Sequence, residues 1–385
     1  MQTFFLAPTR QNVGLTSVAL GVVVALQRQG LRVGFVKPVP QDETHIERSP
    51  HFARVICKID SPNPLPIEQV VQRVSANQND ELLEDVVSLC MSAAQDKDVL
   101  IIEGLHSEPG QSFASNLNND IARSLQAEVI LVANATDEGA AAEANLMASQ
   151  YKSSGRSVAG VIFNKAQANF DAAAAQKELG TTPLWGVIAF NPSLLAPRTL
   201  DIARHLKAEI LVQGDIAKRR VSDVVVAARS ATEMIDRLKP GSLIITAGDR
   251  DDVILATALA ASNDVQLAGL LLTHDSFISD KLVEFAPRAF KSDLPIMRTK
   301  GDTFATATKI SRLPSAVAAD DDARMNSVLD SVAEQLNTDT IMTAVKVPPT
   351  KRMSPPAFRF QLIQKARAAN KRIVLPEGDE PRTIK

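Results

Sequence analysis

The sequence predicts an α/β protein with a doubly wound parallel sheet, followed by a second, smaller α/β domain. Three observations indicate this fold class. A strand, loop, helix and strand fill residues 2–36, apolar strands alternate with helical patterns as far as residue 189, and a new unit begins after a proline-containing passage near residue 196. Strands made of continuous apolar residues are typical of parallel sheets covered by helices on both faces.

The first segment, residues 1–195, alternates strands and helices. The expected strands are 2–6, 32–36, 99–103, 128–133, 157–164 and 183–189, and the expected helices are 15–29, 80–95, 118–125, 137–154 and 170–179. A strand followed by a helix and a parallel strand forms a βαβ unit with a right-handed crossover. The proline-rich stretch 50–66 is interpreted as an irregular connection.

The second segment, residues 196–340, repeats the alternation on a smaller scale. Its expected strands are 210–213, 224–228, 243–247 and 267–272, and its expected helices are 231–238 and 253–261. Residues 341–356 carry two Pro-Pro pairs, which is typical of a linker. Residues 357–385 predict one basic amphipathic helix that covers a sheet, and one strand. Because about 30 residues cannot bury a core, we expect them to be the truncated start of a third domain.

Composition excludes several classes of function. The chain has 385 residues with a formal charge of -2, so net charge favours neither nucleic acid nor an anionic membrane as a partner. One Trp and one Tyr leave few rings to stack on bases. Two cysteines indicate a reducing, cytoplasmic location. No apolar stretch reaches the length of a membrane span, and the N-terminus lacks a signal-peptide pattern.

The loop from Pro8 to Ser17 follows the first strand and opens a long helix, as a phosphate-binding loop does. In the pattern G-x-x-x-x-G-K-[ST], backbone N–H groups and a helix N-terminus attract phosphate, the lysine adds charge and the hydroxyl binds magnesium. Leu15 stands at the lysine position. The candidate phosphate-binding residues are Thr9, Asn12, Val13, Gly14, Thr16 and Ser17.

Three further polar residues follow strands of the first segment. Open α/β sheets bind ligands at the carboxyl ends of their strands, so Lys37, Glu103 and Asn164 are expected to join the loop in one crevice. Each also has a structural interpretation. Lys37 can be a solvated strand-end lysine, Glu103 a buried carboxylate with a hydrogen-bonding role, and Asn164 the cap of the turn that follows.

In the second segment the candidate residues are Asp249, Arg250 and Thr273, at two strand ends. They predict either a bound anion beside Arg250 or a capping network between Asp249 and Arg250. No metal or nucleophile pattern is visible in the sequence. The five histidines are scattered, and Asp320 to Asp322 fit a charged helix start better than a calcium loop.

These motifs resemble known families. Pro8 to Thr16 is similar to the nucleotide loop G-T-D-T-x-V-G-K-T of dethiobiotin synthetase and cobyric acid synthase, whose K-P, acidic and Asn segments resemble 35–39, 101–104 and 160–165. Asp249, Arg250 and Thr273 resemble the DRTGG domain, with His274 and Asp275 in place of its two glycines. Residues 353–385 resemble the start of the phosphate acetyl/butyryltransferase domain, and the order of parts is that of long bacterial phosphate acetyltransferases.

The resemblance implies a function for the intact protein, namely interconversion of acetyl-CoA and phosphate with acetyl phosphate and CoA. The family's catalytic residues lie beyond this chain, so none is assigned here, and no covalent cofactor is expected. The chain itself is expected to sense effectors, with ATP, NADH, pyruvate and phosphoenolpyruvate as candidates, and to assemble as a homo-oligomer. Leu15 predicts no nucleotide turnover. The alternatives are an ATP-dependent ligase of the dethiobiotin type and an inert scaffold.

Overall fold

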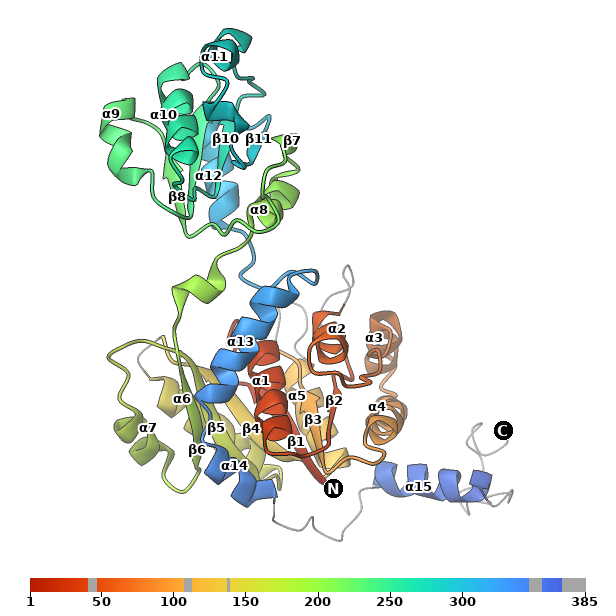
Figure 1. Ribbon diagram of the computed structural model, residues 1–385. Helices are drawn as coiled ribbons and strands as arrows, with labels where there is room; N and C mark the ends of the chain where they lie inside the picture. The colour runs from red at the N-terminus through yellow and green to blue at the C-terminus, as the bar shows by residue number, and fades with distance from the viewer. Residues whose placement is uncertain (41–46, 107–112, 137–138, 346–354, 369–385) are drawn as a thin grey trace. The chain divides into compact units, whose positions relative to one another are not determined.

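The computed structural model describes residues 1–40, 47–106, 113–136, 139–345 and 355–368. The chain divides into two compact units (Figure 1). The first unit contains residues 1–190 and the described residues from 319 onward, and the second unit contains residues 191–318.

The first unit is built on a six-stranded parallel sheet in the order β2-β3-β1-β4-β5-β6. Its strands are the six that the sequence predicts, and the doubly wound parallel fold is confirmed. Since β1 lies between β3 and β4, its carboxyl end opens at the centre of the sheet, where the loop begins. The strands are β1 (Gln2–Pro8), β2 (Val33–Val36), β3 (Val99–Glu103), β4 (Glu128–Asn134), β5 (Val158–Ala166) and β6 (Leu184–Ala189).

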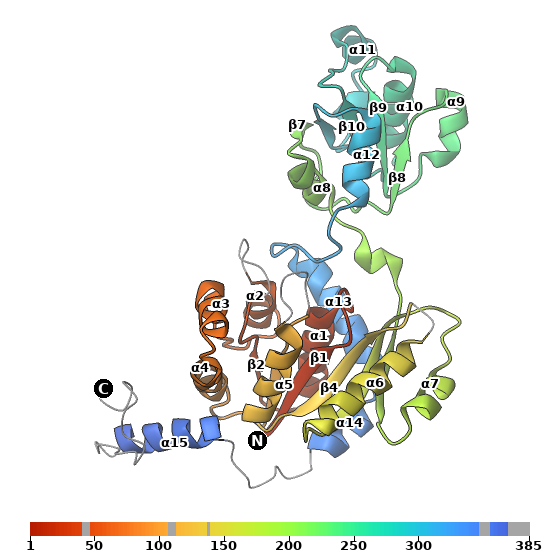
Figure 2. The ribbon, with the colours of Figure 1, turned by 180° about the vertical axis from the view of Figure 1, so that it is seen from behind.

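Helices cover both faces of this sheet. Apolar side chains of α4, α5, α6 and α7 pack on one face in a continuous core, and α1 and α13 lie side by side on the other (Figures 1 and 2). The helices of the first unit are α1 (Leu15–Arg28), α2 (Arg48–Val55), α3 (Ile67–Ser75), α4 (Asn79–Ala93), α5 (Ala114–Ser124), α6 (Ala140–Ser153), α7 (Ala172–Leu179), α13 (Asp322–Glu334), α14 (Thr338–Val345) and α15 (Pro355–Ala368).

The structure places residues 319–340 in the first unit, whereas the sequence analysis expects them at the end of the second. The side chain of Val332 fills the space above Gly21, where a Cβ atom would collide with it. Arg28 pairs with Asp330 at 2.5 Å, and the backbone N–H of Asn337 donates to the carbonyl of Trp185. This arrangement buries the apolar side of α1 that faces away from the sheet, because α13 packs against it.

The stretch 50–66 is not wholly irregular, because α2 occupies its beginning. Pro50 is the third residue of this helix. The first N–H groups of a helix have no acceptor within it, so proline costs no hydrogen bond there. The predicted irregular connection 50–66 therefore overlooks α2, whose start brings Glu47 and Ser49 to the crevice.

The second unit is a five-stranded sheet in the order β7-β11-β10-β9-β8, with β7 antiparallel and the others parallel. Side chains of α9 and α10 pack on one face and those of α8 and α12 on the other. Its elements are η1 (Pro192–Leu195), α8 (Thr199–Leu206), β7 (Glu209–Val212), β8 (Asp223–Val226), α9 (Ala231–Met234), η2 (Ile235–Arg237), β9 (Ser242–Ala247), α10 (Asp251–Ser262), β10 (Gly269–Thr273), α11 (Asp280–Phe285), η3 (Ala289–Lys291), β11 (Ile296–Arg298) and α12 (Thr303–Ser311).

The end of the chain differs in part from expectation. α14 extends to Val345, into the expected linker, and residues 346–354 and the expected strand 372–375 lie outside the described residues. The amphipathic helix is present as α15, but it packs on α4 rather than on a sheet, with Arg359 at 2.9 Å from Glu84. None of the helices that the structure describes has the length and apolar character needed to cross a bilayer.

Candidate functional site

The loop between β1 and α1 contains two residues in the left-handed conformation that anion-binding turns use. Asn12 and Gly14 both adopt positive φ, at 59° and 80°. Left-handed residues alternating with right-handed ones turn successive N–H groups to one side, which forms a concave anion site. Gly14 is required for a second reason, because a Cβ atom there would lie 2.5 Å from the amide nitrogen of Asn164. The loop opens α1, whose N-terminus adds its positive dipole end.

The first turn of α1 is joined to the end of β3. The hydroxyl of Thr16 donates to Oε1 of Glu103 at 2.8 Å and lies 3.1 Å from the hydroxyl of Ser49. Lys37, at the end of β2, places Nζ at 3.7 Å from the same carboxylate oxygen and 3.0 Å from Glu47. The ends of β2 and β3, which are expected to converge, therefore do meet at the first turn of α1. Helix α2 adds Ser49 to this group.

Glu103 is the most constrained member of this group, with only 3% of its surface exposed. Among the described residues, no partner hydrogen-bonds its second oxygen, Oε2. Burial raises the pKa of this carboxyl, while Lys37 and Thr16 act in the opposite direction. A buried acceptor without a donor costs free energy, so this oxygen is prepared for a proton or a ligand group.

Asn164 and Lys165, at the end of β5, hold the loop from the opposite side. The amide nitrogen of Asn164 donates to the carbonyl of Val13 at 2.7 Å, and its oxygen accepts the N–H of Lys165. The ammonium of Lys165 donates to the carbonyl of Asn12 at 2.6 Å. Because its amide nitrogen holds the loop and its oxygen is held by the next residue of its own strand, Asn164 acts here as a brace. Its contact with a nucleobase stays a prediction.

Thr9 and Arg10, two further residues of the loop, have structural partners. Thr9 donates its hydroxyl to Glu143 at 3.2 Å, and Arg10 binds the carbonyl of Asn134 while lying 3.6 Å from Glu143. Val13 is buried, and Ser17 is half-buried in the first turn of α1.

Leu15 is also buried and offers no charge. A loop lysine neutralises phosphate charge during phosphoryl transfer. At this position the loop therefore lacks the cation that assists phosphoryl transfer.

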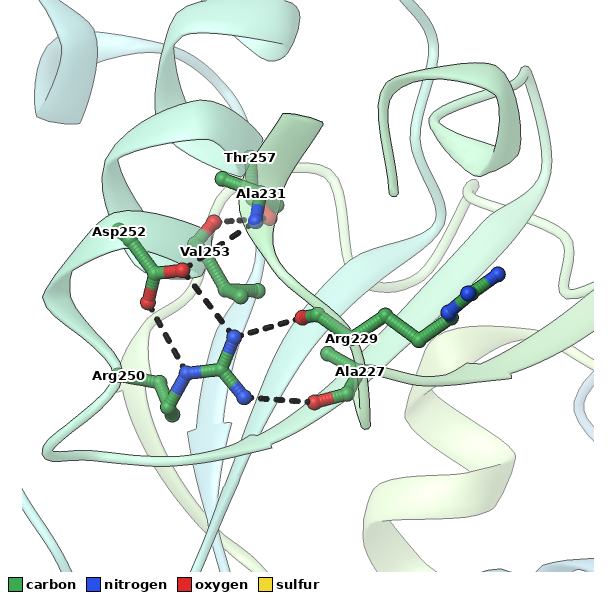
Figure 3. Close-up of polar contacts among 7 residues, drawn as sticks. All are labelled: Ala227, Arg229, Ala231, Arg250, Asp252, Val253 and Thr257. Carbon is green, nitrogen blue, oxygen red and sulfur yellow. Dashed lines mark hydrogen bonds and ion pairs between the residues drawn. The ribbon is translucent and has the colours of Figure 1, made fainter. Parts of the chain in front are cut away.

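In the second unit, Arg250 bonds to neighbours within its own fold (Figure 3). Its guanidinium donates to both carboxylate oxygens of Asp252, at 3.0 and 3.1 Å, and to the carbonyls of Ala227 and Arg229, at 3.2 and 2.6 Å. Asp252 also accepts the N–H of Ala231. The sequence predicts a capping network between Asp249 and Arg250, whereas the structure pairs Arg250 with Asp252 instead. An anion at Arg250 stays a prediction that would require these bonds to break.

The other two candidates of the second unit lie apart from this network. Thr273 is buried, and its hydroxyl donates to the carbonyl of Thr246 and lies 2.9 Å from the hydroxyl of Thr303. Asp249 is exposed. His274 and Asp275 adopt positive φ, at 61° and 54°, so the glycine-like backbone is kept without the glycines.

The second unit also contains a cavity of about 330 Å³. It is lined mainly by aliphatic side chains, including Ile202, Val221 and Ile310, and its one charged lining residue is Asp223. Since no cation lines it, it does not suit an acid such as pyruvate. The described residues also contain no cluster of His, Cys, Asp or Glu that could hold a metal ion.

Sequence reasoning missed two contributors to the site. Glu47 and Ser49 carry no signal, because their place depends on α2. Lys165 is expected at the same crevice, since it follows the strand beside Asn164, but the sequence gives it no role of its own.

Two family models match the chain. Residues 2–198, just over half of it, match a family described as AAA domain. Residues 201–313 match the DRTGG domain. The two matches correspond to the two units, apart from the returning helices.

Curated relatives match the chain over its whole length. The chain is 41% identical to a phosphate acetyltransferase of Deinococcus radiodurans over all of its own length and 57% of the relative. It is 40% identical to one of Pseudomonas aeruginosa over all of its length and 58% of that relative. The chain therefore spans less than two thirds of the curated relatives it matches.

A solved structure with the CBS and DRTGG domains of Clostridium perfringens pyrophosphatase is 22% identical over 32% of this chain and 52% of that one. Its TM-score of 0.26 is too low to support any inference. The loop geometry, the parallel sheet and the family match agree with one another, and the chain belongs to the AAA domain family, with a DRTGG domain as its second unit.

Proposed function

We propose that this chain is the regulatory and assembly region of a phosphate acetyltransferase and that it binds a metabolite effector without catalysing a reaction. Similarity to proteins of that name over the whole chain supports the enzyme class. The intact protein would then interconvert acetyl-CoA and phosphate with acetyl phosphate and CoA, and it would assemble as a homo-oligomer.

One observation carries the assignment of binding without turnover. The loop keeps the left-handed Asn12 and Gly14 and the contact from Thr16 to Glu103, while a buried Leu15 stands where a lysine would act. Geometry for an anion is present, and the charge that assists phosphoryl transfer is absent from its usual position. ATP and NADH fit this chemistry through their phosphates, and phosphoenolpyruvate fits it as an anion. Pyruvate fits it only through its carboxylate.

Calorimetry tests the proposal. ATP, NADH, phosphoenolpyruvate and pyruvate are titrated separately into the whole chain, and hydrolysis of ATP is followed in parallel. We expect saturable binding of at least one of them, no turnover, and weaker binding in Thr16→Val, which keeps the shape of the side chain and removes its hydroxyl. Turnover that disappears in Thr16→Val would support the ligase instead. Absence of binding by all four would favour a scaffold and contradict the proposal.

A further inference from the structure

The loop has a cation that its own sequence pattern does not supply. Lys165 lies at the carboxyl end of β5 with φ of 61°, a conformation that is uncommon for a residue with a side chain. From there its ammonium reaches the carbonyl of Asn12 at 2.6 Å. The lysine thus contacts the loop itself, although about 150 residues separate the two in the sequence.

The other cations near the crevice are already paired with carboxylates. Lys37 lies between Glu47 and Glu103, and Arg10 lies near Glu143. Among the described residues, Lys165 contacts one backbone carbonyl and no carboxylate. An ammonium has three N–H donors, so two remain for a ligand. Burial lowers the pKa of Lys165, as expected for an ammonium held without a counter-charge.

A second observation at the same helix start also indicates a missing partner. Oε2 of Glu103 is buried and without a hydrogen bond among the described residues, beside the first turn of α1. A folded chain rarely leaves such an atom unsatisfied. A ligand that carries a proton or a cation with its phosphates would meet this oxygen.

We propose that Lys165 replaces the missing loop lysine and binds the phosphates of a nucleoside di- or triphosphate held by residues 9–17. On binding, its ammonium exchanges the carbonyl of Asn12 for a phosphate oxygen. This inference rests on the proposed function, since it names the residue that gives the effector site its charge. It also gives Leu15 a physical explanation, because a lysine at position 15 would put two ammonium groups at one loop.

The test compares the affinity of the whole chain for ATP, ADP and inorganic phosphate in four variants. Lys165→Met removes the charge and keeps the length, and we expect it to weaken ATP binding by about 10- to 100-fold, as for loss of a hydrogen bond to a charged group. Lys165→Arg should keep most of the affinity. Lys177→Met, an exposed lysine of α7, is the matched control and should bind as the unaltered chain does.

The double variant Leu15→Lys with Lys165→Met separates charge from structure. If Lys165 supplies the cation, a lysine at position 15 restores the affinity for ATP in this background. If Lys165 only braces the loop, a lysine at position 15 cannot take over that role, and the affinity stays low. The fluorescence of Trp185, buried in the same unit, checks that each variant is folded.

The outcomes distinguish the two proposals. If the unaltered chain binds none of the effector panel, the proposed function fails. If it binds ATP and Lys165→Met binds it equally well, or the double variant stays weak, only the inference about Lys165 is overturned. Binding of inorganic phosphate with the same dependence on Lys165, but not of ATP or ADP, would overturn the nucleotide as its ligand.

Discussion

The two units place charged side chains at the ends of parallel strands and leave them in opposite states. In the first unit, Glu103 and Lys37 are buried, and one carboxylate oxygen has no partner among the described residues. In the second, Arg250 and Asp252 have side chains that are 31% and 46% exposed, and Arg250 bonds both Asp252 and nearby carbonyls. Charged residues that follow parallel strands therefore form a buried group with an unpartnered oxygen in one unit and a partly exposed, hydrogen-bonded network in the other.

The comparison shows how burial separates a binding site from a structural motif. An exposed ion pair contributes little because water screens it, and it can complete its bonds locally. A buried charge depends on the partners that the fold provides. The first crevice is therefore the better candidate for a ligand, although both units carry residues that resemble family motifs.

The largest effect is expected from Lys37→Met. Removing one partner of a buried ion pair leaves an uncompensated charge, so the first unit should lose about 3 kcal/mol of stability at neutral pH. Urea unfolding followed by Trp185 fluorescence reports on this unit, because Trp185 is the one tryptophan of the chain. Adding Glu103→Met should recover most of the loss, and Lys177→Met should change little. A loss below about 0.5 kcal/mol, typical of a surface charge, would show that the pair is not buried in solution.

The pH dependence should have opposite signs in the two units. The pKa of Glu103 is raised, so its folded form holds the proton more tightly than the unfolded chain. Its contribution to stability is present below the ordinary value of 4.5 and is lost as pH rises through the folded pKa. The pKa of Asp252 is lowered to about 2 by Arg250, so its contribution is present above 3.8 and is lost as pH falls toward 2.

Two isosteric variants measure these signs. In the unaltered chain, the stability of the first unit should decline with rising pH by at most about 1.4 kcal/mol per pH unit for one proton. Glu103→Gln should make this decline smaller. Asp252→Asn should flatten only the acid side of second-unit unfolding, followed by far-ultraviolet circular dichroism. A Glu103→Gln variant whose profile matches that of the unaltered chain would contradict the raised pKa.

The smallest effect is expected from Arg250→Ala. Its bonds to two carbonyls and Asp252 are partly exposed, so we expect a loss of about 1 kcal/mol. Amide hydrogen exchange should rise mainly in residues 227–231, which these bonds hold. Arg229→Ala, which removes an exposed pair with Glu233 on a short helix, is the control and should lose about 0.4 kcal/mol or less. Equal losses in both variants would contradict the role given to Arg250.

The sequence by itself determined the strands of the first sheet, the phosphate-loop pattern and the oddity of Leu15. Local periodicity and short motifs carry this information, because each depends on residues close together in the chain. The strand-end rule also brought Lys37 and Glu103 to one crevice, since parallel strands share an edge.

Only the tertiary structure decided which partners complete that crevice. Glu47 and Ser49 arrive on a helix whose third residue is proline, and α13 returns to α1 from beyond the second unit. Lys165 reaches the loop through one left-handed residue at the end of β5. These contacts join residues that are far apart in the chain. Whether a distant lysine or glutamate reaches the loop depends on tertiary packing, which the periodicity of a short segment does not encode.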